Sequence, residues 1–154
     1  MDVAALKLTD LTLVREDPEM NRRYTLTVPE FVAGQQDRIG LIGESGSGKS
    51  TFLEILGLLA WPSSLGDYMI SPDGDGRMMD LGPSLMKADT ETLTAIRARL
   101  IGFVLQDGGL IPYLSVRENA ELAVELSSGL TTASHTRIKN LANEMGIGDY
   151  LDRL

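Results

Sequence analysis

Apolar and polar residues alternate over residues 5–14 of the 154-residue chain and again over residues 24–28. A period of two is typical of a strand with one buried face. We therefore predict two strands, the first with a bulge near Asp10 and the second closed by Pro29. The polar residues 15–23 between them indicate a hairpin connection.

Two continuous apolar runs, residues 39–42 and 100–105, predict strands that are buried on both faces, as in a parallel sheet. Short strand-like stretches at residues 68–70 and 77–79 lie between these runs. An apolar run over residues 51–59 predicts a helix that is buried on several sides. The alternation of strands with helices indicates an α/β fold.

The second half of the chain has the pattern of helices with clear starts and stops. Asp89 is a predicted N-cap of a helix with apolar residues at helical spacing. Residues 115–118, Ser-Val-Arg-Glu, form a capping box that opens a further helix, which Gly129 stops. A last helix is predicted over residues 132–145.

The composition is that of a soluble globular domain, with 43% apolar and 23% charged residues. Fourteen basic and 22 acidic residues give a net charge of −8, which argues against a nucleic-acid backbone as the main partner. The absence of cysteine excludes disulfides and thiolate chemistry. No run approaches the roughly 20 apolar residues of a membrane span, and the N-terminus lacks the pattern of a signal peptide.

A glycine-rich stretch between the first predicted buried strand and the next helix carries the strongest chemical signal. Its spacing, Gly-x-x-x-x-Gly-Lys-Ser, is that of a phosphate-binding P-loop. The glycines let the backbone turn with positive φ, so that successive N–H groups point at an anion. Lys49 is expected to reach the β- and γ-phosphates of a nucleotide, and the Ser50 hydroxyl to ligate Mg²⁺. The predicted nucleotide-binding residues are Gly43, Glu44, Ser45, Gly46, Ser47, Gly48, Lys49, Ser50 and Thr51.

Gln106 and Asp107 end the second buried run, and α/β sheets bind their ligands at the carboxyl ends of strands. Gln106 is a candidate for orienting water or contacting Mg²⁺. Asp107 is either a metal partner or part of a turn, since Asp-Gly-Gly is strong turn chemistry. The single histidine, His135, and two arginines at a helix end, Arg97 and Arg99, are interpreted as solvated side chains.

The P-loop, the leucine-rich helix after it and the sequence Ile-Gly-Phe-Val-Leu-Gln at residues 101–106 resemble the ATP-binding subunit of an ABC transporter. Residues 101–106 are similar to the Q-loop of that family. The sequence of residues 110–119 looks most like the lipoprotein-release and macrolide-export branch. The P-loop alone is shared by many families, whereas the P-loop and the Q-loop in this order are specific.

The resemblance implies a P-loop NTPase core with an N-terminal antiparallel β part and the start of a helical subdomain. Residues 1–36 would hold the N-terminal strands, residues 37–114 the core from P-loop to Q-loop, and residues 115–154 the helical part. The resemblance also implies binding of ATP and Mg²⁺, with Gln106 sensing the γ-phosphate and the metal. The implied partners are membrane-embedded transporter subunits and a second ATP-binding subunit, and the implied location is cytoplasmic, peripheral at the inner face of the membrane.

The sequence departs from the family pattern in several places. It stops before the expected Leu-Ser-Gly-Gly-Gln signature, and it holds neither the Asp-Glu pair of the Walker B strand nor the switch histidine. The aromatic residue expected near residues 14–17 for stacking on the base is absent, and Tyr24 is a weak substitute. We therefore expect one incomplete domain that binds ATP rather than turning it over.

Two other functions remain open at this point. One is a small self-contained P-loop kinase or NTPase that uses Asp107 as its metal partner, and the other is a non-hydrolysing nucleotide-binding interaction module. A kinase is expected to have an arginine-rich lid and an acceptor pocket, and the sequence indicates neither. The transported substrate is not encoded here, because membrane subunits select it.

Overall fold

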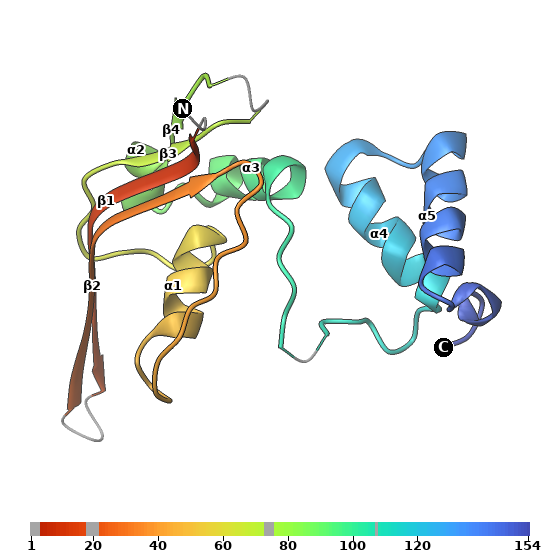
Figure 1. Ribbon diagram of the computed structural model, residues 1–154, viewed down its shortest axis with the longest axis horizontal. Helices are drawn as coiled ribbons and strands as arrows, with labels where there is room; N and C mark the ends of the chain where they lie inside the picture. Colours follow the sequence, from red (N-terminus) through yellow and green to blue (C-terminus); the bar gives the residue numbers. More distant parts are fainter. Residues whose placement is uncertain (1–3, 18–21, 73–75, 107) are drawn as a thin grey trace. The chain divides into compact units, whose positions relative to one another are not determined.

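The computed structural model describes residues 4–17, 22–72, 76–106 and 108–154 (Figure 1). The chain forms two compact units, residues 1–100 and residues 101–154. The first unit contains a sheet and the P-loop, and the second contains two helices and a short C-terminal turn.

The first unit is built on a four-stranded antiparallel sheet with the strand order β2-β1-β3-β4. β1 (Ala4–Asp17) and β2 (Arg22–Gly34) form a long hairpin, and β3 (Tyr68–Ile70) and β4 (Met79–Asp80) continue the sheet beyond β1 (Figure 1). The predicted N-terminal strands are confirmed, and both are longer than the alternation indicated. Both strands extend beyond the alternating residues because each supplies the other with backbone hydrogen-bonding partners along the hairpin.

The bulge predicted near Asp10 does not occur in the pairing of β1 with β2. Asp10 has a φ of 49°. The pairs Thr9–Glu30 and Leu11–Val28 flank it, so neither strand has an extra residue at this point. The predicted bulge is therefore wrong, and the backbone departs from regular strand geometry at Asp10 through its positive φ alone.

Pro29 does not close the second strand, which continues to Gly34. Because β2 forms an edge of the sheet, a residue without an N–H is tolerated there. The extension places Phe31 against Phe52 of the following helix, with ring centroids 5.2 Å apart and ring planes at 83°. This edge-to-face contact attaches the helix after the P-loop to the hairpin.

Three helices complete the first unit: α1 (Lys49–Leu56), α2 (Gly82–Met86) and α3 (Thr90–Leu100). The N-cap predicted at Asp89 is confirmed, since its carboxylate accepts a hydrogen bond from the Thr92 N–H at 3.2 Å. The least exposed side chains of this unit form its core: Leu8, Leu11, Ile55, Leu58, Tyr68, Leu81, Leu85 and Leu93.

The residues that follow α1 are fixed by two side-chain hydrogen bonds. The Tyr68 hydroxyl donates to the Leu56 carbonyl at 2.7 Å, and burial raises the pKa of this hydroxyl well above its usual range. The Arg97 guanidinium donates to the Leu58 carbonyl, also at 2.7 Å. Arg97 is therefore a structural tie between α3 and the end of α1, and its interpretation as a solvated charge is wrong, whereas Arg99 is exposed as predicted.

The two predicted buried strands do not form. Residues 39–42 are not part of the sheet, and the side chains of Ile39 and Ile42 are 48% and 99% exposed. In the other run, Leu100 ends α3, and Val104 is 88% exposed. A parallel strand is stable only between neighbours that satisfy its backbone and cover its side chains. Within the described ranges the antiparallel sheet supplies no such neighbours.

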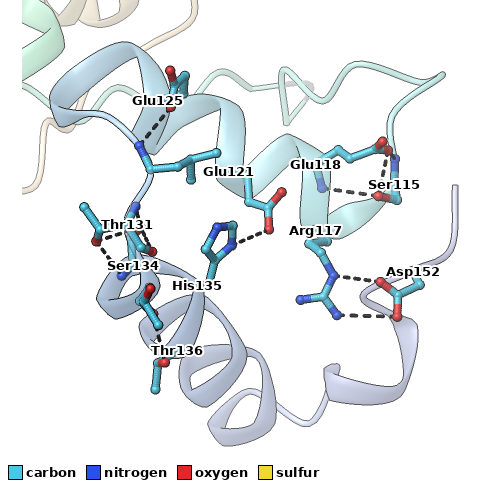
Figure 2. A network of polar contacts seen from close by, with 12 residues as sticks. Ser115, Arg117, Glu118, Glu121, Glu125, Thr131, Ser134, His135, Thr136 and Asp152 are labelled. Atoms are coloured by element: carbon cyan, nitrogen blue, oxygen red, sulfur yellow. Dashed lines mark hydrogen bonds and ion pairs between the residues drawn. The ribbon is translucent and has the colours of Figure 1, made fainter.

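The second unit consists of α4 (Val116–Ser128), α5 (Thr132–Glu144) and the 3₁₀ turn η1 (Gly148–Tyr150). The capping box predicted at the start of α4 is confirmed, because the Ser115 and Glu118 side chains each accept from the other's backbone N–H (Figure 2). Of all the helices in the described ranges, none is both long enough and apolar enough to span a bilayer.

The C-terminal residues of the second unit close back onto the start of α4. The Val116 N–H donates to the Arg153 carbonyl at 2.9 Å, and the Arg117 N–H donates to the Leu151 carbonyl at 2.8 Å. These two bonds satisfy N–H groups that a helix start otherwise leaves without a partner. Asn119 also fixes the approach to α4, since its side-chain oxygen accepts from the Ile111 N–H at 2.7 Å.

His135 links the two helices of this unit. Its Nδ1 lies 2.9 Å from Oε1 of Glu121 on α4, as Figure 2 shows. The His135 side chain is 49% exposed and the Glu121 side chain 18%. The histidine is thus a partly exposed contact between helices, and its description as simply solvated is incomplete.

Candidate phosphate-binding site

The P-loop turns at residues 45–48 and runs directly into α1. Gly46 has a φ of 81° and Gly48, the N-cap of α1, a φ of 95°. Both values lie in the left-handed region that glycine enters at low cost. The Ser47 N–H donates to the Glu44 carbonyl at 3.3 Å, and the Phe52 N–H donates to the Gly48 carbonyl at 2.8 Å. These bonds close the turn and begin the helix.

The ammonium group of Lys49 is folded back over the loop. Its Nζ donates to the carbonyl oxygens of Gly43 at 2.9 Å and Glu44 at 2.6 Å, and to the Ser47 hydroxyl at 3.3 Å. An ammonium carries three protons, so these three acceptors define its position. The loop therefore holds one positive charge in place beside its own backbone.

The start of α1 adds to this local positive potential. The N–H groups of the first helical turn carry partial positive charge, and no acidic side chain lies in that turn. Ser50 is exposed and lies in the same turn. Dipole and ammonium together can attract an anion locally even though the chain as a whole has a net charge of −8.

A cavity of about 370 Å³ opens at this loop. Its lining residues come from the P-loop, the first turn of α1 and the hairpin: Arg15, Tyr24, Ser45, Gly46, Gly48, Lys49, Ser50 and Thr51. The structure thus brings six of the nine predicted nucleotide-binding residues to one cavity. Gly43 and Glu44 contact Lys49 instead, and Ser47 does the same.

Two residues of the hairpin line this cavity, and the motif alone does not indicate them. Arg15 on β1 and Tyr24 on β2 are directly opposite each other in the strand register. Tyr24 lies against Gly48, and its buried hydroxyl has no hydrogen-bond partner in the part of the chain that the structure describes. Arg15 Nη2 lies 3.5 Å from Oε2 of Glu54 on α1. The feature that could have identified both residues is the strand register of the hairpin, which pairs Arg15 with Tyr24.

Gln106 belongs to the second unit, where it lies in a turn with an exposed side chain. Its predicted contact with Mg²⁺ or water remains a prediction. Asp107, the alternative metal partner, lies outside the described residues.

Comparisons with known proteins identify the family of this chain. Residues 26–154 match the family model for the ABC transporter. The uncharacterized ABC transporter ATP-binding protein YbbA of Escherichia coli (strain K12) is 38% identical over 129 residues, which are 84% of this chain and 52% of YbbA. The macrolide export ATP-binding/permease protein MacB of Marinobacter nauticus is 32% identical over 113 residues, covering 73% of this chain and 16% of MacB.

A solved structure of an ATP-binding cassette has the same fold as this chain. The dimeric structure of a post-hydrolysis state of the ATP-binding cassette MJ0796, bound to ADP and Pi, superposes on this chain with a TM-score of 0.75 at 26% identity. The superposition covers 96% of this chain and 60% of that one. It confirms the predicted fold class, an α/β P-loop NTPase fragment of the ABC type.

The chain belongs to the ABC transporter family. Within that family it corresponds to part of the ATP-binding component, and it spans about half the length of curated relatives such as YbbA. The two alternatives, a small self-contained P-loop kinase or NTPase and a non-hydrolysing nucleotide-binding interaction module, are not favoured, because the matched relatives are ABC transporter ATP-binding proteins.

Proposed function

We propose that this chain binds Mg²⁺-ATP through its P-loop as part of an ABC-type transport ATPase. The observation that carries the proposal is the position of the Lys49 ammonium. Three oxygens of the loop bind it, and Lys49 is itself the first residue of α1. All three of its protons go to loop oxygens here, so the ammonium would exchange at least one of these oxygens for a phosphate oxygen when nucleotide binds.

The phosphates would lie against the N–H groups of residues 46–51, where the helix dipole and Lys49 act in the same direction. The Ser50 hydroxyl oxygen would be the ligand of Mg²⁺ from the first unit, since Ser50 is exposed and lines the cavity. Gln106 is the second proposed ligand of the metal. Mg²⁺ would neutralise phosphate charge and orient the triphosphate.

The proposed partners are membrane-embedded transporter subunits and a second ATP-binding subunit, at the cytoplasmic face of the membrane. MacB carries ATP-binding and permease functions in one named protein, and MJ0796 was solved as a dimer. Both support such an assembly.

Titration calorimetry of Mg²⁺-ATP into the wild-type chain and Lys49→Ala tests the proposal. A charge-assisted hydrogen bond is worth about 1.5–3 kcal/mol, so we expect the variant to bind at least about tenfold more weakly. Lys139→Ala is the matched control, because it removes the same charge from an exposed position on α5. Equal affinities of the wild type and Lys49→Ala would refute the proposal.

A further inference from the structure

Two tyrosine hydroxyls of the first unit are buried, and they differ in their hydrogen bonding. The Tyr68 hydroxyl donates to the Leu56 carbonyl at 2.7 Å. The Tyr24 hydroxyl has no hydrogen-bond partner among the residues that the structure describes. The large majority of buried polar side-chain atoms in proteins are paired, because an unpaired one has given up water without a replacement. An unpaired hydroxyl therefore marks a place where a ligand can supply the missing bond.

The Tyr24 hydroxyl lies at the P-loop. It occupies the space that a side chain at Gly48 would need, and Gly48 is the N-cap of α1. Tyr24 also lines the cavity of about 370 Å³, together with Lys49 and Ser50. The hydroxyl is thus beside the N–H groups of the first helical turn, which have no partners within the helix.

The carbonyl groups of the loop already accept hydrogen bonds from other donors. The Gly48 carbonyl accepts from the Phe52 N–H at 2.8 Å, and the Gly43 and Glu44 carbonyls accept from the Lys49 ammonium. The hydroxyl proton of Tyr24 and the N–H groups at the start of α1 therefore share the same need, an acceptor. A phosphate group carries several acceptor oxygens and a negative charge, so it can bind the N–H groups and the hydroxyl together.

We propose that Tyr24 is a phosphate-binding residue of this site, its hydroxyl donating a hydrogen bond to a phosphate oxygen at the P-loop. This inference rests on the proposed function, because it assumes that phosphate occupies the loop. The hydroxyl contacts phosphate, so its contribution does not depend on the base of the nucleotide. The contact forms only in the loaded loop, so the hydroxyl contributes to binding and not to the folding of the empty chain.

Calorimetry on the full chain with Tyr24→Phe tests the binding half of the inference. This variant removes the hydroxyl and keeps the ring that packs against Gly48. We expect it to weaken the binding of Mg²⁺-ATP, and of inorganic tripolyphosphate with Mg²⁺, by about tenfold each, the value of one hydrogen bond to a charged group. Tyr113→Phe is the matched control, because it removes a hydroxyl from an exposed tyrosine of the second unit and should leave both affinities unchanged.

Urea unfolding without ligand tests the folding half. Tyr24→Phe should leave the unfolding midpoint unchanged or raise it, because no hydrogen bond of the empty chain is lost. Tyr68→Phe should lower the midpoint, because it removes the hydrogen bond to the Leu56 carbonyl. A decrease in Tyr24→Phe as large as that in Tyr68→Phe would show that the Tyr24 hydroxyl has a partner in the empty chain, and this result would overturn the inference.

The binding results separate this inference from the proposed function. If Tyr24→Phe binds both ligands as the wild type does, and binding still depends on Lys49, only the inference is refuted. A loss confined to ATP would show that Tyr24 contacts the nucleoside and not phosphate, and an equal loss in Tyr113→Phe would show that the effect is not specific to the site. Each of these results also overturns the inference. Wild-type chain that binds neither ligand refutes the proposed function and the inference together.

Discussion

The hydroxyl group of Tyr24 occupies the space that a side chain at Gly48 would need. A Cβ built at Gly48 overlaps this hydroxyl and lies 3.2 Å from Cδ1 of Leu26. Gly46, two residues earlier in the loop, has no atom within 4 Å of a built Cβ. Both glycines have left-handed φ values, so they differ mainly in their surroundings.

This difference predicts unequal effects of alanine at the two positions. Gly46→Ala should cost about 1–2 kcal/mol of the free energy of unfolding, from left-handed backbone strain alone. Gly48→Ala should cost at least about 1 kcal/mol more, because Tyr24 and Leu26 must also move. Urea unfolding of both variants measures the difference. Equal losses would show that Tyr24 does not pack tightly on the loop.

Acid should weaken the second unit through two carboxyl groups. The Arg117 guanidinium, which donates to Asp152 at 2.7 Å, lowers the pKa of that carboxyl, and hydrogen bonds from the Ser115 N–H and hydroxyl lower the pKa of Glu118. A carboxyl whose pKa is lower in the folded chain stabilises it above the unfolded pKa, and this contribution is lost as the pH falls through the folded pKa. The affected window is therefore below about pH 4.

Thermal unfolding followed by circular dichroism between pH 6 and pH 2 tests this expectation. Asp152→Asn should remove part of the acid dependence, and Glu144→Gln, a charge removed from the end of α5, should leave it unchanged. An acid profile of Asp152→Asn that coincides with the wild-type profile would contradict the argument. Because both carboxyl groups are exposed, added salt should also reduce the effect.

Local signals in the sequence predicted local structure well. The capping residues at Ser115 and Asp89 were correctly predicted because a cap depends on side chains within three residues of it. The buried strand predicted at residues 39–42 is wrong, because a buried strand depends on partners far along the chain. The position of Arg15 at the cavity could not be predicted for the same reason, because it depends on the register that pairs Arg15 with Tyr24.

The exposed apolar residues predict self-association of the isolated chain. Ile42 is 99% exposed and Val104 is 88% exposed, and each lies in a run whose composition suits a buried strand. Exposed apolar segments of this kind promote association between copies. We expect sedimentation velocity to show oligomers that increase with concentration, and Ile42→Asp with Val104→Asp to increase the monomer fraction.

Thr25→Asp with Thr27→Asp is the control for added charge, because both residues are polar and exposed on β2. If this variant increases the monomer fraction as much, charge rather than apolar surface explains the change. A wild-type chain that stays monomeric at high concentration and unfolds cooperatively at high temperature would contradict the prediction.

The last prediction concerns turnover. Attack on the γ-phosphate requires a positioned water, a metal held from two sides and charge stabilisation beyond the P-loop. The chain offers Lys49, the Ser50 hydroxyl, backbone N–H groups and the proposed ligand Gln106, and its sequence contains no Leu-Ser-Gly-Gly-Gln signature or Walker B Asp-Glu pair. Interactions that bind the ground state and transition state equally lower a dissociation constant without lowering the barrier.

We therefore expect the 154-residue chain to bind Mg²⁺-ATP and to hydrolyse it at or near the uncatalysed rate. Phosphate release from the purified chain measures this, and Lys49→Ala serves as the control for a contaminating ATPase. Turnover of about one per second that Lys49→Ala abolishes would show that the P-loop and its neighbours suffice for catalysis. That result would favour the self-contained P-loop enzyme, in which the metal partner comes from within these 154 residues. Background-level release from both proteins, with ATP binding lost only in the variant, supports a chain that binds nucleotide and depends on further groups for chemistry.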